Sequence, residues 1–124
     1  MPDSDANPLV GQRCVACRGD EPTVTEVELA VLLPYVPDWT VVEVDGIPRL
    51  RRVFRFRDFV GALTFTDRVG AIAEEQGHHP ALLTEWGRTT VSWWTHALGG
   101  LHRNDFIMAA KTDQLYEGSQ APLG

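Results

Sequence analysis

The chain has 124 residues, of which 44% are hydrophobic and 23% charged, and its formal net charge is −6 at pH 7. This length suits one domain with a hydrophobic core of its own. The acidic balance argues against nucleic-acid binding, because a protein that binds phosphate backbones needs a basic face. The apolar stretches are too short to cross a bilayer. The first ten residues lack the pattern of a signal peptide, so a cytoplasmic location is expected.

The first part of the chain is rich in Pro, Asp, Gly and Asn, which predicts a flexible, loosely held N-terminal arm over residues 1–22. Both cysteines of the chain, Cys14 and Cys17, lie in this arm as a CxxC pair. A structural zinc site needs four ligands, and a CxxC pair alone supplies two of them. A redox CxxC pair is expected at the strand–helix junction of a βαβ unit, and the sequence predicts no such unit. We therefore expect thiols that oxidise or bridge chains, with zinc shared between two chains as an open alternative.

A helix and a hairpin are predicted after the arm. Thr25 begins a capping-box pattern for a helix that ends at Pro34. Residues 38–57 then predict two strands around Asp45-Gly46, a strong hairpin signal. Pro48 indicates a hairpin loop longer than two residues.

A long helix is predicted over residues 59–76. Asp58 is its expected N-cap, and Gly77 is expected to end it in the left-handed conformation. The predicted buried stripe consists of Phe59, Leu63, Thr66, Val69 and Ala73.

A second hairpin and a last helix complete the pattern. Residues 81–86 and 89–96 predict strands around a turn at Gly87-Arg88, and residues 104–116 predict a helix. No strand–helix–strand unit demands parallel pairing, so we expect an α+β domain with a four-stranded antiparallel sheet and helices packed on one face. The domain is expected to span residues 23–118 and a tail residues 119–124. The other face of the sheet would stay uncovered unless a second copy packs on it.

The four histidines of the chain, at positions 78, 79, 96 and 102, lie within 25 residues of one another. Adjacent residues in an extended segment point to opposite sides, so His78 and His79 are poorly placed to bind one ion. The zinc spacings HxH and HExxH are absent. Histidine changes charge near neutral pH, so a cluster suits general acid–base catalysis. The alternative is that these histidines are only capping or surface residues, and their grouping in the sequence argues against it.

The surroundings of the histidines support a proton-transfer role. His78 follows the long helix, whose unpaired terminal carbonyls carry partial negative charge. This charge favours a protonated imidazole, which can act as a proton donor. Pro80 holds the backbone of His79 extended. Glu74 lies one helical turn before His78, close enough to orient it. His96 ends the predicted strand over residues 89–96, which is expected to run beside the His78–His79 segment. The three histidines are therefore expected to line one cleft.

The run Glu74-xxx-His78-His79-Pro80, followed by Trp86, His96 and Asp105, resembles the signature of the pterin-4a-carbinolamine dehydratases. The resemblance extends over roughly residues 24 to 117 and implies loss of water from a 4a-hydroxytetrahydropterin to give a quinonoid dihydropterin. It implies neither a metal nor a redox cofactor, and a homodimer or homotetramer assembled through the sheets.

The resemblance also implies a role for each residue of the signature. His78, His79 and His96 would form the acid–base and pterin-holding set. Pro80 and Trp86 would shape the pocket. Glu74 and Asp105 would orient histidines or close the site.

Two features depart from the more familiar family pattern. Many members have Thr at the position of His102, and since His is a poorer cap, the last helix is expected to begin at Asn104, with His102 at the mouth of the cleft. The N-terminal arm is typical of an extended subtype. Some proteins related to that subtype are RuBisCO assembly factors with eroded catalytic motifs. Because the signature is intact here, an enzyme ranks first, and a non-catalytic assembly factor with RuBisCO as its client is the alternative.

Overall fold

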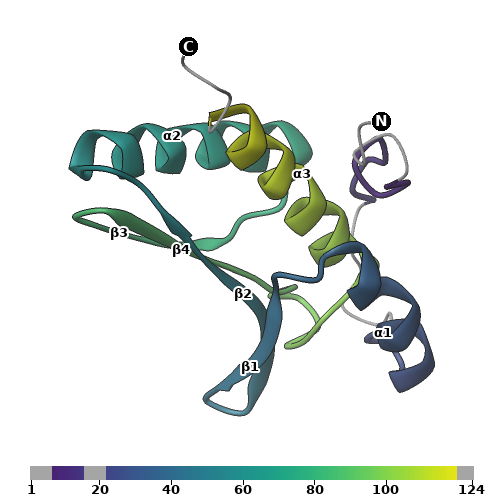
Figure 1. Ribbon diagram of the computed structural model, residues 1–124. Helices are drawn as coiled ribbons and strands as arrows, with labels where there is room; N and C mark the ends of the chain where they lie inside the picture. The colour runs from purple at the N-terminus through teal and green to yellow at the C-terminus, as the bar shows by residue number, and fades with distance from the viewer. Residues whose placement is uncertain (1–6, 16–21, 120–124) are drawn as a thin grey trace.

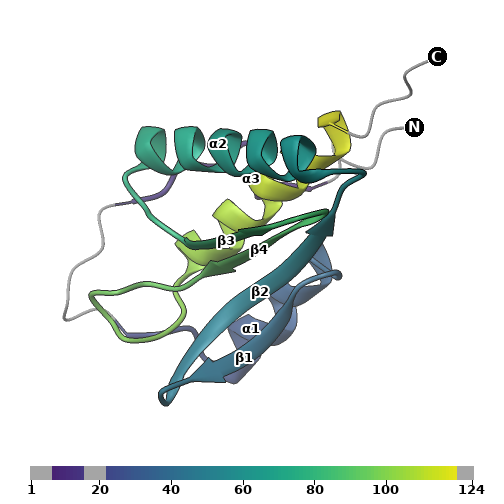
Figure 2. The same cartoon turned by 90° about the vertical axis from the view of Figure 1, so that its left-hand side faces the viewer.

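The computed structural model describes residues 7–15 and 22–119, and it places helices on one face of a four-stranded antiparallel sheet (Figures 1 and 2). The strands follow the order β1-β2-β4-β3. Their bounds are Thr40–Val44 (β1), Ile47–Arg55 (β2), Ala81–Glu85 (β3) and Arg88–Trp93 (β4). The helices are Glu26–Leu32 (α1), Phe59–Gln76 (α2) and Arg103–Ser119 (α3), with a short 3-10 turn, η2, at Leu33–Tyr35. The predicted α+β fold is confirmed.

The first hairpin is tighter than the sequence predicts. Val44 pairs with Ile47, so the loop contains only Asp45 and Gly46, which both have positive φ values, 53° and 77°. These are the values of the two-residue turn that suits the twist of a hairpin. Pro48 is tolerated because β2 pairs with β4 only from Leu50 onward, so no second strand requires an N–H from Pro48.

Side-chain caps fix the ends of α1 and α2 as predicted. Thr25 and Glu28 form a reciprocal capping box at α1. At α2, Asp58 accepts a hydrogen bond from the Gly61 amide at 2.8 Å, and Gly77 ends the helix at φ 65°. Among the described residues, no helix is long and apolar enough to cross a membrane.

The buried face of α2 differs in part from the predicted stripe. Val69 and Ala73 are buried as expected, whereas Phe59 and Leu63 are each 43% exposed. Ala62 and Phe65 are buried in their place, and the Thr89 hydroxyl of β4 donates to the Ala62 carbonyl at 2.9 Å. A small residue lets the helix approach β4 this closely.

The core between sheet and helices is aromatic. Phe54, Phe56 and Phe65 pack with Tyr116 of α3, at centroid separations of 4.8 to 5.8 Å. Trp93 is fully buried, and its indole N–H donates to the Thr112 hydroxyl at 3.1 Å. These contacts fix α3 across β2 and β4.

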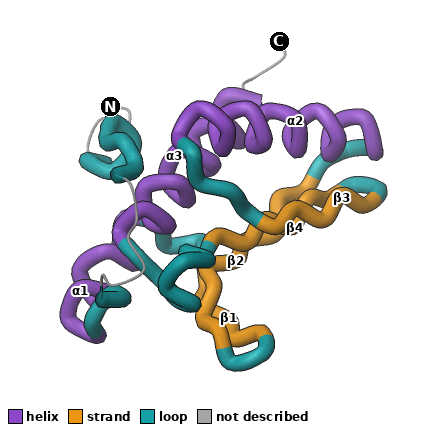
Figure 3. Tube along the Cα trace, turned by 180° about the vertical axis from the view of Figure 1, so that it is seen from behind, coloured by secondary structure: helices purple, strands orange, loops and turns teal. Residues whose placement is uncertain are grey.

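Residues 7–15 pack against α3 (Figures 1 and 3), so the prediction of a loosely held arm is wrong for this part of the chain. Leu9 is fully buried in the core, and Lys111 Nζ donates to the Val10 carbonyl at 2.8 Å. Leu9 and Val10 are a short apolar pair with no helical or strand period, which explains why the sequence did not reveal this contact. Residues 1–6 and 16–21 of the predicted arm, including Cys17, lie outside the described residues.

The face of the sheet away from the helices, here called the open face, carries a row of arginines. Cross-strand pairing brings Arg51 beside Ser92, Val53 beside Thr90 and Arg55 beside Arg88. The residues that line its hollow of about 510 Å³ include Arg49, Arg51, Val53, Arg55, Leu83 and Arg88. Glu85 binds Arg88 through two hydrogen bonds, which leaves a net positive surface on an acidic protein.

Candidate active site

The site is organised by the first turn of α3, which begins one residue earlier than the predicted Asn104. His102 precedes the helix, and its ring Nδ1 accepts a hydrogen bond from the Asn104 amide at 3.0 Å. Asp105 completes the arrangement by accepting from the His102 amide at 2.9 Å. Asp105 at the third helical position thus reaches back to the cap residue as in a capping box, whereas the imidazole nitrogen binds the amide of the second position. His102 therefore acts as a helix cap.

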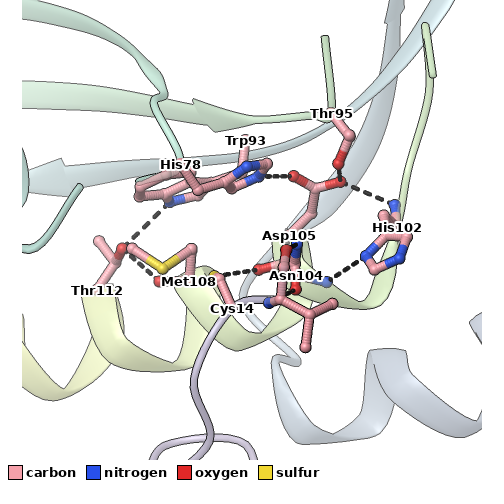
Figure 4. Close-up of polar contacts among 10 residues, drawn as sticks. Cys14, His78, Trp93, Thr95, His102, Asn104, Asp105, Met108 and Thr112 are labelled. Carbon is pink, nitrogen blue, oxygen red and sulfur yellow. Dashed lines mark hydrogen bonds and ion pairs between the residues drawn. The ribbon is translucent and has the colours of Figure 1, made fainter. Parts of the chain in front are cut away.

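The carboxylate of Asp105 is fully buried and binds three groups (Figure 4). Its Oδ1 lies 2.6 Å from Nε2 of His78. Its Oδ2 accepts from the Thr95 hydroxyl and the His102 amide, both at 2.9 Å. An ionised carboxylate can only accept hydrogen bonds, so in a pair with ionised Asp105 the Nε2 of His78 is the donor and Nδ1 is left for proton exchange.

His78 is turned inward by the end of α2. The left-handed Gly77 reverses the chain, and the His78 amide donates to the Ala73 carbonyl at 3.1 Å. The imidazole is 9% exposed and lies parallel to the Trp93 indole, with an interplanar angle of 8° and centroids 5.7 Å apart. The ring is thus held by a flat wall on one side and a carboxylate at its edge.

The partner of Glu74 differs from the prediction. Its carboxylate binds Nε2 of His79, where the sequence predicted that it would orient His78. The turn at Gly77 breaks the helical spacing, so His79 folds back over the last turn of α2 in place of His78. Both side chains of the Glu74–His79 pair are exposed, His79 at 59%. Pro80, half-buried, follows and leads into β3.

His96 lies just beyond β4 on the side of the open face. Its exposed ring contacts the Trp94 indole with centroids 4.5 Å apart. The Arg49 guanidinium covers the same indole, 3.8 Å from its centroid. The side chains of Trp93 and Thr95 bind residues of α3 and so face this helix, whereas His96 lies in the turn that follows Thr95. Thr95 binds the same Asp105 carboxylate as His78, so His78 and His96 lie at the same end of the second hairpin.

Trp86 lies at the opposite end of this hairpin. It sits in the β3–β4 turn with Gly87, and its side chain is 73% exposed. The five residues of β3 separate it from the histidines by roughly 17 Å at the usual strand rise. Within one chain, the structure therefore does not bring Trp86 to the pocket that the sequence predicted it would shape.

Thr95, Trp93 and Trp94 contact the signature residues, and the sequence analysis did not assign them individual roles. Thr95 binds Asp105, and the two tryptophans each contact one histidine. The signal that could have found them is the alternation of β4, because it places Thr95 on the inward side with Trp93.

The described residues hold no cluster of three or more His, Cys, Asp or Glu side chains that could bind a metal ion. Burial raises the pKa of the Cys14 thiol to about 11, and the negative charge of Asp105 adds to this effect while Lys111 opposes it. A thiol that stays protonated at neutral pH is a poor nucleophile and a poor metal ligand.

Comparison with known proteins agrees with this geometry. The family model described as pterin 4 alpha carbinolamine dehydratase matches residues 22–115. A protein from Gloeobacter violaceus that is named, provisionally, for this activity is 63% identical over 107 residues, which is 86% of this chain and 92% of that protein. A relative from Nitrosococcus oceani with the same provisional name is 59% identical, over 86% of this chain and 95% of its own length.

Solved structures show the same fold. A transcriptional coactivator/pterin dehydratase from Brucella melitensis is 31% identical, with a TM-score of 0.68 over 76% of this chain and 98% of that one. A pterin dehydratase-like protein identified as a RuBisCO assembly factor in the alpha-carboxysome is 22% identical, with a TM-score of 0.54 over 64% of this chain and 89% of that one, and this is a likeness of fold alone. The chain belongs to the pterin-4a-carbinolamine dehydratase family.

Proposed function

We propose that the protein catalyses the dehydration of a 4a-hydroxytetrahydropterin, in the recycling of tetrahydropterins. The observation that carries this proposal is the buried Asp105–His78 pair at 2.6 Å, with the exposed ring of His96 at the same end of the hairpin. A buried carboxylate that fixes one imidazole nitrogen leaves the other nitrogen of the ring in a defined orientation for proton transfer.

The reaction needs two proton transfers. The C4a–O bond breaks and the hydroxyl leaves as water after receiving a proton from an acid. A base removes the proton on N5, and the C4a=N5 double bond forms. We assign these transfers to His78 and His96, because one ring is held by Asp105 and the other is exposed beside Trp94. The Glu74–His79 pair and Pro80 border the same end of the sheet and would hold the pterin.

An activity assay with a matched control tests the proposal. The substrate, 4a-hydroxytetrahydropterin, is generated in situ and its dehydration is followed with wild type, His96→Ala and Trp86→Ala. Loss of a positioned acid or base typically costs about 10²–10⁴-fold in rate. We expect a loss in this range for His96→Ala and none for Trp86→Ala, which removes another exposed ring far from the histidines. Equal activity of wild type and His96→Ala would argue against the assignment.

We also propose that the protein forms a homodimer or homotetramer, as its family resemblance implies. Exposed apolar side chains supply surfaces for self-association: Phe59, Val60 and Leu63 on α2, and Val53 and Leu83 on the open face. Light scattering coupled to gel filtration measures the mass directly, and a monomer at micromolar concentration would contradict this proposal.

A non-catalytic assembly factor for RuBisCO is the second candidate. The open face favours it, because arginines beside exposed Val53 and Leu83 suit an acidic, partly apolar protein surface. The test is the yield of assembled RuBisCO with wild type and with Arg51→Glu/Arg55→Glu. A yield that depends on these arginines, together with no dehydratase activity, would favour this function over the enzyme.

A further inference from the structure

The N-terminal segment contacts the candidate active site at a position that the family resemblance does not cover. The Asn104 side chain is 2% exposed and binds the backbone of Val15 in both directions. Its Nδ2 donates to the Val15 carbonyl at 2.8 Å, and its Oδ1 accepts from the Val15 amide at 3.0 Å. Asn104 directly precedes Asp105, the carboxylate that holds His78 (Figure 4).

The same segment also binds the end of α2. The Cys14 amide donates to Oε1 of Gln76 at 3.0 Å, and the Cys14 thiol lies 3.9 Å from the Asn104 carbonyl oxygen. Gln76 is the last residue of α2 and stands two positions before His78. Cys14 and Val15 thus bridge the two helix ends that carry the two members of the buried pair.

We propose that Cys14 and Val15, together with Gln76 and Asn104, form a clamp that positions His78 against Asp105. Four contacts from one short segment reach both sides of a single hydrogen bond. The consequence for catalysis rests on the proposed dehydratase function, whereas the effect on the His78–Asp105 hydrogen bond does not. The family model matches residues 22–115, and the segment lies before this match. Gln76 and Asn104 are positioning residues, because they act through their neighbours.

The segment has separate anchors that keep it folded. Leu9 is buried in the core, and Lys111 binds the Val10 carbonyl about two helical turns away from Asn104. Removing one clamp contact should therefore loosen the segment at the site without releasing it from α3. Lys111→Met provides the matched control, since it removes an anchor of the same segment on the same helix but none of the four clamp contacts.

Two variants test the clamp at its two ends. Asn104→Ala removes the two-way contact with Val15. Gln76→Met removes the acceptor for the Cys14 amide with little change of shape. Gln76→Glu keeps an oxygen at this position and should preserve the hydrogen bond. Because Gln76 is only half-buried, its variants provide the test if Asn104→Ala fails to fold.

The readouts are kcat and KM for dehydration, and the ¹H–¹⁵N NMR signal of the His78 Nε2–H. We expect Asn104→Ala and Gln76→Met to lower kcat about 10-fold, below the 10² that an ångström of misplacement can cost. KM should change less than kcat, and the His78 signal should shift or broaden. Gln76→Glu and Lys111→Met should match the wild type in both measurements.

The outcomes separate the clamp from the proposed function. An unchanged His78 signal and unchanged kcat in folded Gln76→Met and Asn104→Ala would overturn the clamp. Equal losses in Lys111→Met would also overturn it, because the effect would then follow general stability. An inactive wild type would overturn the dehydratase function, and the His78 signal alone would then decide on the clamp.

Discussion

Asp105 holds His78 from a fully buried position, with 2.6 Å between Oδ1 and Nε2. The second oxygen of the same carboxylate ties Thr95 and the start of α3 to this pair. One side chain thus joins the end of β4, the first turn of α3 and the histidine that follows α2.

Replacing Asp105 by Asn tests this relationship. The amide keeps the size of the side chain but cannot accept hydrogen bonds at both of its terminal atoms, so His78 loses its fixed orientation. We expect kcat for dehydration to fall about 10²-fold, within the range of acid–base catalysis. Asp113→Asn is the control: Asp113 is also on α3 and binds Arg52 and Trp39, away from the histidines. Its kcat should stay near wild type, and an equal loss would contradict the role of Asp105.

The imidazole cap of α3 gives a prediction about stability. His102→Ala removes the acceptor for the Asn104 amide, and loss of an N-cap costs about 1 kcal/mol. His102→Thr should retain or raise stability, because a hydroxyl is the usual acceptor in a capping box. Urea unfolding measures both free energies. A stability of His102→Ala equal to wild type would show that the ring nitrogen contributes nothing as a cap.

Cys14 predicts a loss of stability at alkaline pH. Burial raises its pKa in the folded protein from 9.0 to about 11, with Asp105 adding to the shift. Between these two values the unfolded thiol ionises while the folded one stays protonated, so the folded state binds more protons and the free energy of unfolding falls as pH rises. The loss should be on the order of 1 kcal/mol, because Cys14 is only partly buried.

Cys14→Ser isolates this contribution from other groups that titrate at high pH. The difference in unfolding free energy between wild type and Cys14→Ser should be constant below pH 9 and should shift against the wild type as pH rises toward 11. A difference that does not vary with pH would contradict a buried, protonated thiol.

The sequence predicts that Trp86 shapes the pterin pocket, whereas the structure places it at the other end of the second hairpin. Its ring is 73% exposed in the β3–β4 turn, far from the histidines. We expect kcat and KM for Trp86→Leu to lie within about twofold of wild type, as is usual for exposed residues outside a site. If the same assay instead shows that KM rises by about tenfold or more, substrate binding has been lost. Trp86 would then contact the substrate from a neighbouring copy of the chain.

The element order of this fold could be predicted because its ends carry strong local signals. Thr25 and Asp58 are side-chain caps, and Gly46 and Gly77 supply positive φ values that other residues rarely adopt. Each signal acts within a few residues, so it can be recognised in one sequence. The four-stranded order then follows from two hairpins and no parallel crossover.

The contacts of the site could be predicted only in part. The signature assigned His78 and Asp105 to one site, and the structure joins them by a hydrogen bond. The helical spacing predicted that Glu74 would orient His78. Because the turn at Gly77 redirects the chain, Glu74 binds His79 instead. The contact between Val15 and Asn104 joins residues 89 positions apart. Neither residue belongs to a periodic pattern, so only the folded structure reveals their contact.

The most direct measurement is the rate at which purified wild-type protein converts 4a-hydroxytetrahydropterin into quinonoid dihydropterin, followed by stopped-flow absorbance against the spontaneous reaction. If His78 and His96 act as proposed, the rate rises in proportion to protein concentration, and Asp105→Asn removes most of the increase. A folded wild type that leaves the spontaneous rate unchanged would contradict the proposed catalysis.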